Sequence, residues 1–189
     1  MLLTCFFQIT FEDRIVNKKH NTHLSVDCTD CRIQQKGRLF ASYKFKGKSA
    51  LWYEVALGIL SGDIKWLNGP YPCKNWPDIN IFCDGLIEEL NLGERVEADH
   101  GYKVESSYVT KVPCAVLTRC SEEADALQKR VQGRHETVNA RLKSFHILDQ
   151  VYRHDPTQHG YVFRAVAVLV QLSIKNGDPL FSVDYEVVF

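Results

Sequence analysis

The sequence has no excess of charge of either sign, because 23 Lys and Arg residues are balanced by 23 Asp and Glu residues. Overall charge therefore gives no attraction towards nucleic acid or anionic membranes, and such contacts must come from local clusters. Low-complexity tracts and repeats of fixed period are also lacking, which excludes a disordered chain and a solenoid. With 189 residues, 45% of them hydrophobic, the chain is expected to form a single domain with a buried core.

Long apolar runs are scarce as well. The most apolar stretch, residues 161–174, contains Arg164 and Gln171, and it is shorter than the ~20 residues that a bilayer span needs. Residues 2–7 have no basic leader and are soon followed by Glu12 and Asp13, which is not typical of a secretory segment. We therefore expect no contact with a membrane.

The seven cysteines are odd in number and scattered along the chain. This usage favours reduced thiols in an intracellular compartment over a disulfide framework. Cys28 and Cys31 have the spacing of half a zinc site, but no second pair at a matching spacing follows. On a strand their sulfurs would also face opposite sides, so we do not expect a zinc site.

Acidic residues inside a strand-like segment are the most informative feature that is present. Residues 22–33 read as a central strand, and alternation places Asp27 and Asp30 on opposite faces of it. An acid in mid-strand is unfavourable by propensity and costly to bury, so it needs a partner such as a cation. The alternative is that Asp27 is a structural acid satisfied by backbone donors. We interpret Asp30 as structural.

The remaining pattern predicts a mixed α/β fold. Residues 51–60 and 64–67 form a hairpin through a turn at 61–63, and the Asn-Gly-Pro-Tyr-Pro segment at 68–72 ends its second strand. A helix capped by Asp78 follows. The later elements are a helix to about residue 90, strands at 95–99 and 112–117, a helical region at 121–148 with a break at Gly133, and a helix at 161–174.

Three carboxylates could then be brought together. Asp27 lies in the first strand, Asp99 ends the fourth, and Glu136 lies on a helix whose Val138 and Leu142 would pack inwards. Such hard oxygen ligands favour Mg²⁺ or Mn²⁺, and two such ions can stabilise the attacking and leaving oxygens of a phosphodiester. Taken singly, Asp99 could begin a turn and Glu136 could be a solvated helix acid.

A basic segment at residues 34–50 has no acid and is interleaved with Phe40, Tyr43 and Phe45. Basic residues alternating with aromatic ones favour contact with DNA, although such a segment can also be a solvated loop. Lys143, on the helix of Glu136, could likewise contact a phosphate or be an ordinary exposed residue. The candidate DNA-contacting residues are Lys36, Arg38, Lys44, Lys46, Lys48 and Lys143.

Four segments together resemble the DDE endonuclease domain of Harbinger-type (PIF/Harbinger) transposases. They are VDCTDCRI at 26–33, GDIKWLNGP at 62–70 with DINIF at 78–82, EADHGY at 97–102 and RHETVNARLK at 134–143. The resemblance runs over residues 22–189 and leaves 1–21 as an N-terminal stub. It implies a ribonuclease H-like fold, a mixed five-stranded sheet flanked by helices.

The resemblance also implies an activity. It implies cleavage of double-stranded DNA with two Mg²⁺ or Mn²⁺ ions, strand transfer, and action in the nucleus. Asp27, Asp99 and Glu136 match the family's three metal-binding acids, whereas Asp78 is interpreted as a helix cap.

Two departures from the family's pattern are visible. Its helix-turn-helix is not recognisable in this sequence, so a separate DNA-binding partner protein would deliver the domain to DNA. Cys28 stands where close relatives more often have glycine, but its side chain should point away from the face of Asp27. The alternative function is a catalytically silent descendant that acts as a DNA- or protein-interaction module.

Overall fold

The structure is a computed structural model of the whole chain. It describes residues 9–15, 21–35, 37–99, 102, 109–110 and 122–184. The predicted fifth strand at 112–117 lies outside these residues, and so does Lys36. Among the described residues, no helix combines the length and the apolar character that crossing a membrane requires.

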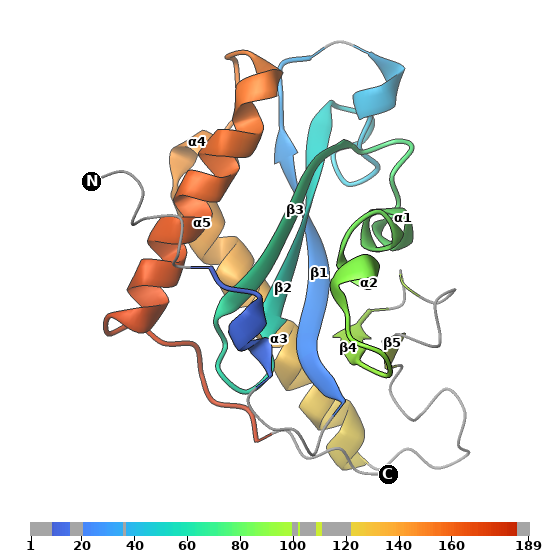
Figure 1. Cartoon of the computed structure of the whole chain (residues 1–189). Helices are drawn as coiled ribbons and strands as arrows, with labels where there is room; N and C mark the ends of the chain where they lie inside the picture. Colours follow the sequence, from blue (N-terminus) through green and yellow to red (C-terminus); the bar gives the residue numbers. More distant parts are fainter. Residues whose placement is uncertain are drawn as a thin grey trace.

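A mixed sheet forms the centre of the molecule (Figure 1), with the strand order β3-β2-β1-β4-β5. β1 pairs antiparallel with β2, and β2 antiparallel with β3, whereas β1–β4 and β4–β5 are parallel pairs. The strands are β1 (Thr22–Arg32), β2 (Ala50–Gly58), β3 (Ile64–Pro72), β4 (Arg95–Ala98) and β5 (Val109–Thr110). Because β5 has only two residues, the other four strands make up most of the sheet.

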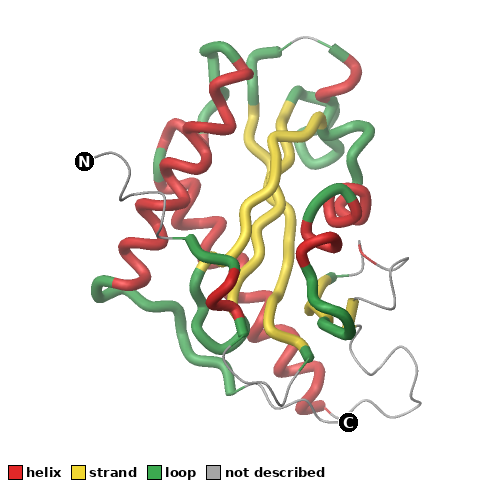
Figure 2. The backbone as a smooth tube through the Cα atoms, in the orientation of Figure 1, coloured by secondary structure: helices red, strands yellow, loops and turns green. Residues whose placement is uncertain are grey.

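Helices cover both faces of this sheet (Figures 1 and 2). They are α1 (Asp78–Cys83), α2 (Leu86–Glu89), α3 (Glu122–Ser144), α4 (His146–Asp149) and α5 (His159–Lys175). Val138 and Leu142 of α3 pack with Val55 of β2 on one face, where α4 and α5 also lie. Phe82 and Leu86 of α1 and α2 pack on the other face. The predicted mixed α/β fold is confirmed.

The central strand β1 agrees almost to the residue with its predicted bounds. It is paired on both sides and is buried along most of its length, so its side chains alternate between two cores. Cys31 belongs to the core under α3 and α5, whereas Leu24 and Val26 belong to the core under α1 and α2. This alternation turns Asp27 towards α3 and Asp30 away from that face.

The prediction that residues 68–72 end a strand is wrong, because β3 continues through them to Pro72. β3 is an edge strand, and its prolines are tolerated because an edge strand can leave backbone N–H groups unpaired. Gly69 has a φ of +118°, and a Cβ there would lie 2.7 Å from the Trp52 carbonyl oxygen. Only glycine therefore fits where β3 approaches β2 so closely.

Two helix predictions also need correction. The helix after Asp78 is split into α1 and α2, because Gly85 between them has non-helical backbone angles (φ −158°, ψ −81°). Gly85 also lies so close to β3 that a Cβ there would be 2.3 Å from the Asn68 side-chain nitrogen. The N-cap of α1 is Pro77, so Asp78 is the first helical residue and not the predicted cap. The expected break at Gly133 does not occur, and α3 runs unbroken from Glu122 to Ser144.

Candidate active site

Asp27 and Asp99 meet at one end of the parallel β1–β4 pair. Val26 of β1 pairs with Ala98 of β4, and each aspartate directly follows the paired residue. Strand alternation turns both away from the core under α1 and α2, to which Val26 and Ala98 belong. Both line one cavity of about 220 Å³. The strands thus place two carboxylates together, as the sequence predicts.

The third predicted acid, Glu136, lines the same cavity from α3. Its helix is fixed in rotation by Val138 and Leu142, which are buried against the sheet, and Glu136 itself is exposed. The cavity is lined by Ser25, Val26, Asp27, Glu97, Ala98, Asp99, Gln128, Val131, Gln132, His135 and Glu136. All three candidate acids therefore face one small space.

A hydrogen bond joins α3 to β1 beside these acids. His135 Nε2 and Ser25 Oγ lie 2.9 Å apart, and both side chains are buried. Burial lowers the pKa of His135 to about 4, so the ring is neutral at physiological pH. Sequence reasoning missed this pair; the signal was a polar residue two positions before Asp27 and a histidine directly before Glu136.

The pKa of the Asp27 carboxyl is raised. Burial raises its pKa to about 6, and the negative charges of Asp99 and Asp78 act in the same direction. The Cys28 backbone N–H donates to Asp27 Oδ1 at 2.8 Å and opposes the shift, as does the positive charge of Lys44. Asp27 is therefore a carboxylate near neutral pH, in a place that disfavours its charge.

A second set of polar side chains lies on the opposite face of the sheet, away from the cavity of Asp27. The Cys28 sulfur lies 3.4 Å from the Tyr102 hydroxyl, so its predicted direction away from Asp27 is confirmed. Glu54 is fully buried and accepts a hydrogen bond from Trp66 Nε1 at 3.2 Å. Burial raises the pKa of Glu54 to about 8. Burial likewise raises the pKa of Asp78, with a smaller contribution from Asp99.

Two of the predicted DNA-contacting lysines converge on Asp30. Asp30 is fully buried, and its Oδ2 accepts a hydrogen bond from Ser42 Oγ at 3.0 Å. Lys44 Nζ lies 3.4 Å and Lys143 Nζ 3.8 Å from Asp30 Oδ1. Asp30 is therefore structural, as predicted, and it joins the 42–48 loop to the end of α3. Arg38, Lys46 and Lys48 are exposed in and beside that loop.

With this geometry in place, comparison with known proteins assigns the family. Residues 26–171, more than half of the chain, match the family described as DDE superfamily endonuclease. The chain belongs to this family. No curated protein and no solved structure matches it.

The acids that this DDE superfamily endonuclease brings together have the chemistry of a hard-cation site. Asp27, Asp99 and Glu136 offer carboxylate oxygens to one cavity, and the raised pKa of Asp27 reflects a place where a cation would compensate buried negative charge. Within the described residues, however, no three or more His, Cys, Asp or Glu side chains are arranged to hold a metal ion.

Proposed function

We propose that this chain is the endonuclease domain of a Harbinger-type transposase, with a ribonuclease H-like fold occupying residues 22–189. It cleaves phosphodiesters of double-stranded DNA in a reaction dependent on Mg²⁺ or Mn²⁺, and it can join the strand it frees to a new site. The observation that carries this proposal is the cavity shared by Asp27, Asp99 and Glu136. The family match and the strand order of the sheet support it.

In this proposal Asp27, Asp99 and Glu136 would hold two divalent ions. When bound, such ions supply positive charge that stabilises both the attacking and the leaving oxygen of the phosphodiester. Asp27 must be ionised for this role, and the Lys44 charge and the Cys28 N–H both favour the ionised form. His135 stays neutral and holds α3 against β1 through Ser25, which keeps Glu136 at the cavity.

The basic residues of the 42–48 loop and the end of α3 would contact the DNA backbone. Lys44 and Lys143 meet over Asp30, so two lysines distant in sequence present their charge in one place. Contacts to phosphates position a duplex but carry no sequence information. A separate DNA-binding partner protein would therefore supply target choice. We expect such a reaction on chromosomal DNA to take place in the nucleus.

A second candidate function is a catalytically silent module that binds DNA or another protein. One observation favours it: within the described part of the chain, the acidic side chains are not arranged as a ready-made metal site. The endonuclease needs Asp27, Asp99 and Glu136 for its activity, whereas the silent module does not. A DNA-cleavage assay therefore distinguishes the two functions directly.

The test is nicking of a supercoiled plasmid with Mg²⁺, with Mn²⁺ and with chelator. We expect metal-dependent nicking that is abolished in Asp27→Asn, Asp99→Asn and Glu136→Gln, each of which keeps the volume but removes the charge. Because removal of an outer-shell partner alone costs about 10–100-fold, each decrease should exceed about 100-fold. Glu88→Gln, an exposed acid on α2, is the matched control and should nick at the parental rate.

Two outcomes would contradict the catalytic proposal. A variant of one of the three acids that nicks at the parental rate shows that this acid holds no metal. A parent that binds DNA but nicks with neither ion favours the silent module.

A further inference from the structure

An aromatic side chain stands in solvent among the lysines of the 42–48 loop. Tyr43 is fully exposed, and Lys44, Lys46 and Lys48, which follow it, are exposed as well. No acidic residue occurs between residues 34 and 50. Single exposed apolar residues are common on protein surfaces, so the surroundings of this ring decide what it can do.

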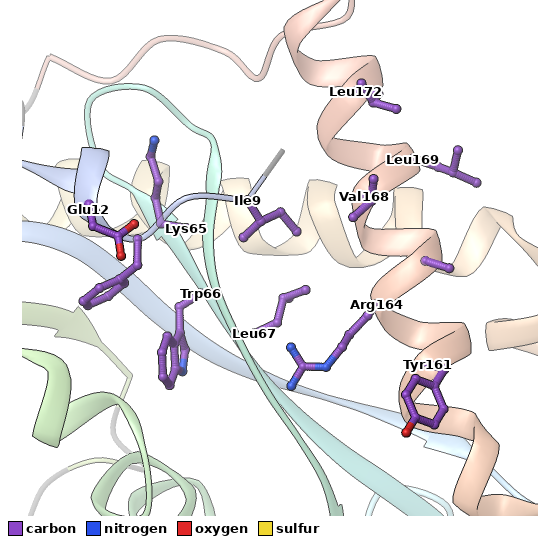
Figure 3. Close-up of a pocket in the computed structure, with 12 residues that line it drawn as sticks. Ile9, Glu12, Lys65, Trp66, Leu67, Tyr161, Arg164, Val168, Leu169 and Leu172 are labelled. Atoms are coloured by element: carbon purple, nitrogen blue, oxygen red, sulfur yellow. The ribbon is translucent and has the colours of Figure 1, made fainter. Parts of the chain in front are cut away.

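A second exposed tyrosine, Tyr161 of α5, has different surroundings. It is 72% exposed and lines a mainly apolar groove between β3 and α5, together with Leu169 and Leu172 (Figure 3). Its ring therefore continues an apolar surface. The ring of Tyr43 lies instead within a positively charged surface, and proteins that bind unpaired nucleic acid combine basic and aromatic side chains in this way.

The 42–48 loop holds Tyr43 in a fixed place. Its backbone is closed by hydrogen bonds, in which Ser42 N–H donates to Lys48 O at 3.0 Å and Lys46 N–H donates to Tyr43 O at 3.1 Å. The hydroxyl of the buried Ser42 donates to Asp30 of β1 at 3.0 Å and ties the loop to the central strand. Because the backbone of Tyr43 is already ordered, little further freedom is lost when its ring binds a partner.

Lys44, the residue after Tyr43, connects the loop to the helix that carries Glu136. Its Nζ lies 3.4 Å from Asp30 Oδ1, and Lys143 Nζ of α3 lies 3.8 Å from the same atom. Lys143 follows Glu136 by seven residues, which is about 10 Å along a helix axis. A duplex rises about 3.4 Å for each base pair. The loop is thus a few base pairs away from a phosphodiester held at the acids.

We propose that Tyr43 stacks on an unpaired DNA base near the cleavage site while the lysines of its loop contact the backbone. Every base has a flat π face, so an aromatic side chain can stack on it whatever the sequence. In an intact duplex the neighbouring base pairs cover this face, so the site takes a base that is unpaired or flipped out. The inference rests on the proposed contact of the 42–48 loop with DNA, and it adds a preference for locally opened duplex.

The test measures binding of the full chain in chelator and at fixed salt, so that no DNA is cleaved. Two short duplexes of the same sequence serve as probes, one fully paired and one with a single bulged adenine analogue whose fluorescence falls when it stacks. We expect the parent to bind the bulged duplex more tightly than the paired one and to quench the analogue.

Variants of Tyr43 assign this preference to its ring. Tyr43→Ala should weaken binding to the bulged duplex by about 5- to 100-fold, the effect of removing one stacked base. It should also abolish the quenching, while its affinity for the paired duplex and its melting temperature stay close to those of the parent. Tyr43→Trp keeps a stacking face and should retain the preference. Tyr161→Ala, which removes an exposed ring outside the basic loop, is the matched control and should behave as the parent.

Three results would overturn the proposal. They are equal affinity of the parent for the two duplexes, quenching that persists in Tyr43→Ala, and equal weakening of both duplexes by Tyr43→Ala, which would make Tyr43 a backbone contact. These results are distinct from failure of the proposed function. Lys46→Gln and Lys48→Gln on the paired duplex test the backbone contact, and plasmid nicking tests cleavage, and neither measurement involves an unpaired base.

Discussion

Asp27 and Asp99 directly follow the paired residues Val26 and Ala98 on two parallel strands, and both line one cavity. After burial and the opposing Cys28 N–H, the negative charge of Asp99 is the next cause that sets the pKa of Asp27 at about 6. The charge of Asp99 therefore disfavours the ionised form of Asp27. A charged Asp27 lowers the stability of the fold in this place unless an opposite charge compensates it.

The first prediction concerns how stability depends on pH. The pKa of Asp27 is raised in the folded state, from its ordinary value of 3.8 to about 6, so between these values the folded protein binds the extra proton. Its contribution to stability is therefore present below pH 4, is lost as pH rises to 6, and stays lost above. In chelator at pH 7.5, Asp27→Asn should be more stable than the parent by roughly 2 kcal/mol.

Urea unfolding of parent and Asp27→Asn at several pH values measures this difference. Asp149→Asn changes an exposed acid and is the control, which should follow the parent. A variant less stable than the parent at pH 7.5 would mean that Asp27 is a structural acid.

The second prediction concerns Glu54 and a higher pH range. Burial raises its pKa from the ordinary value of 4.5 to about 8, so the stability contributed by the protonated form is fully present below pH 4.5, falls as pH rises between these two values, and is lost above pH 8. Glu54→Gln stays neutral and can still accept the Trp66 N–H. We expect the variant to match the parent near pH 5 and to exceed its stability at pH 9 by at least about 1 kcal/mol. Thermal melts of the parent and the variant across this pH range test the prediction. Melting temperatures that change with pH in parallel for the two proteins would contradict the raised pKa of Glu54.

The third prediction tests how firmly residues 9–15 are attached. Arg14 and Glu94 form a buried pair with side chains 6% and 3% exposed, and hydrogen bonds from Arg14 lower the pKa of Glu94 although burial alone would raise it. Arg14→Met leaves a buried charge unpaired and should cost about 3–5 kcal/mol. Adding Glu94→Leu should restore most of this stability.

The Arg141–Asp178 pair provides the control for Arg14. Asp178 is 65% exposed, so Arg141→Met should cost less than about 1 kcal/mol. Equal costs for the two arginine variants in guanidinium unfolding would show that burial of the Arg14 pair has no energetic consequence.

The fourth prediction concerns DNA binding. The chain should bind duplex DNA weakly and without sequence preference, with an affinity that falls steeply as salt rises. Lys46→Gln and Lys48→Gln should each weaken binding and reduce the salt slope by about 1 for every phosphate that the variant no longer neutralises. Lys175→Gln, at the end of α5, should change neither the affinity nor the slope. Tight, sequence-selective binding at physiological salt would contradict the expected need for a separate partner.

Much of the sheet could be predicted because its signals are local. Alternation along β1 predicted its bounds and the opposite directions of Asp27 and Asp30, and helical spacing around Val138 predicted that Glu136 is free of the core. The split between α1 and α2 was not predicted, because the non-helical angles of Gly85 and its position beside Asn68 of β3 leave no mark in the spacing of the apolar residues. The 3.6-residue pattern continues unbroken through that point.

The site was predictable in its acids but not in what surrounds them. The surroundings of the acids depend on residues that are far apart in sequence. They include the buried Glu54, the pair of His135 with Ser25, and the meeting of Lys44 and Lys143 over Asp30. No local pattern specifies such pairs. Burial of a glutamate inside β2 also contradicts strand propensity, so only the packed sheet reveals it.

Calorimetric titration of the chelator-treated protein with Mn²⁺ tests the central claim most directly, because it asks whether Asp27, Asp99 and Glu136 act together. We expect saturable binding to the parent, a melting temperature that climbs with Mn²⁺ concentration, and the absence of both effects in Asp27→Asn, Asp99→Asn and Glu136→Gln. Glu88→Gln should bind as the parent does. A parent that takes up no Mn²⁺ across millimolar concentrations, or three acid variants that bind it unchanged, would contradict the account.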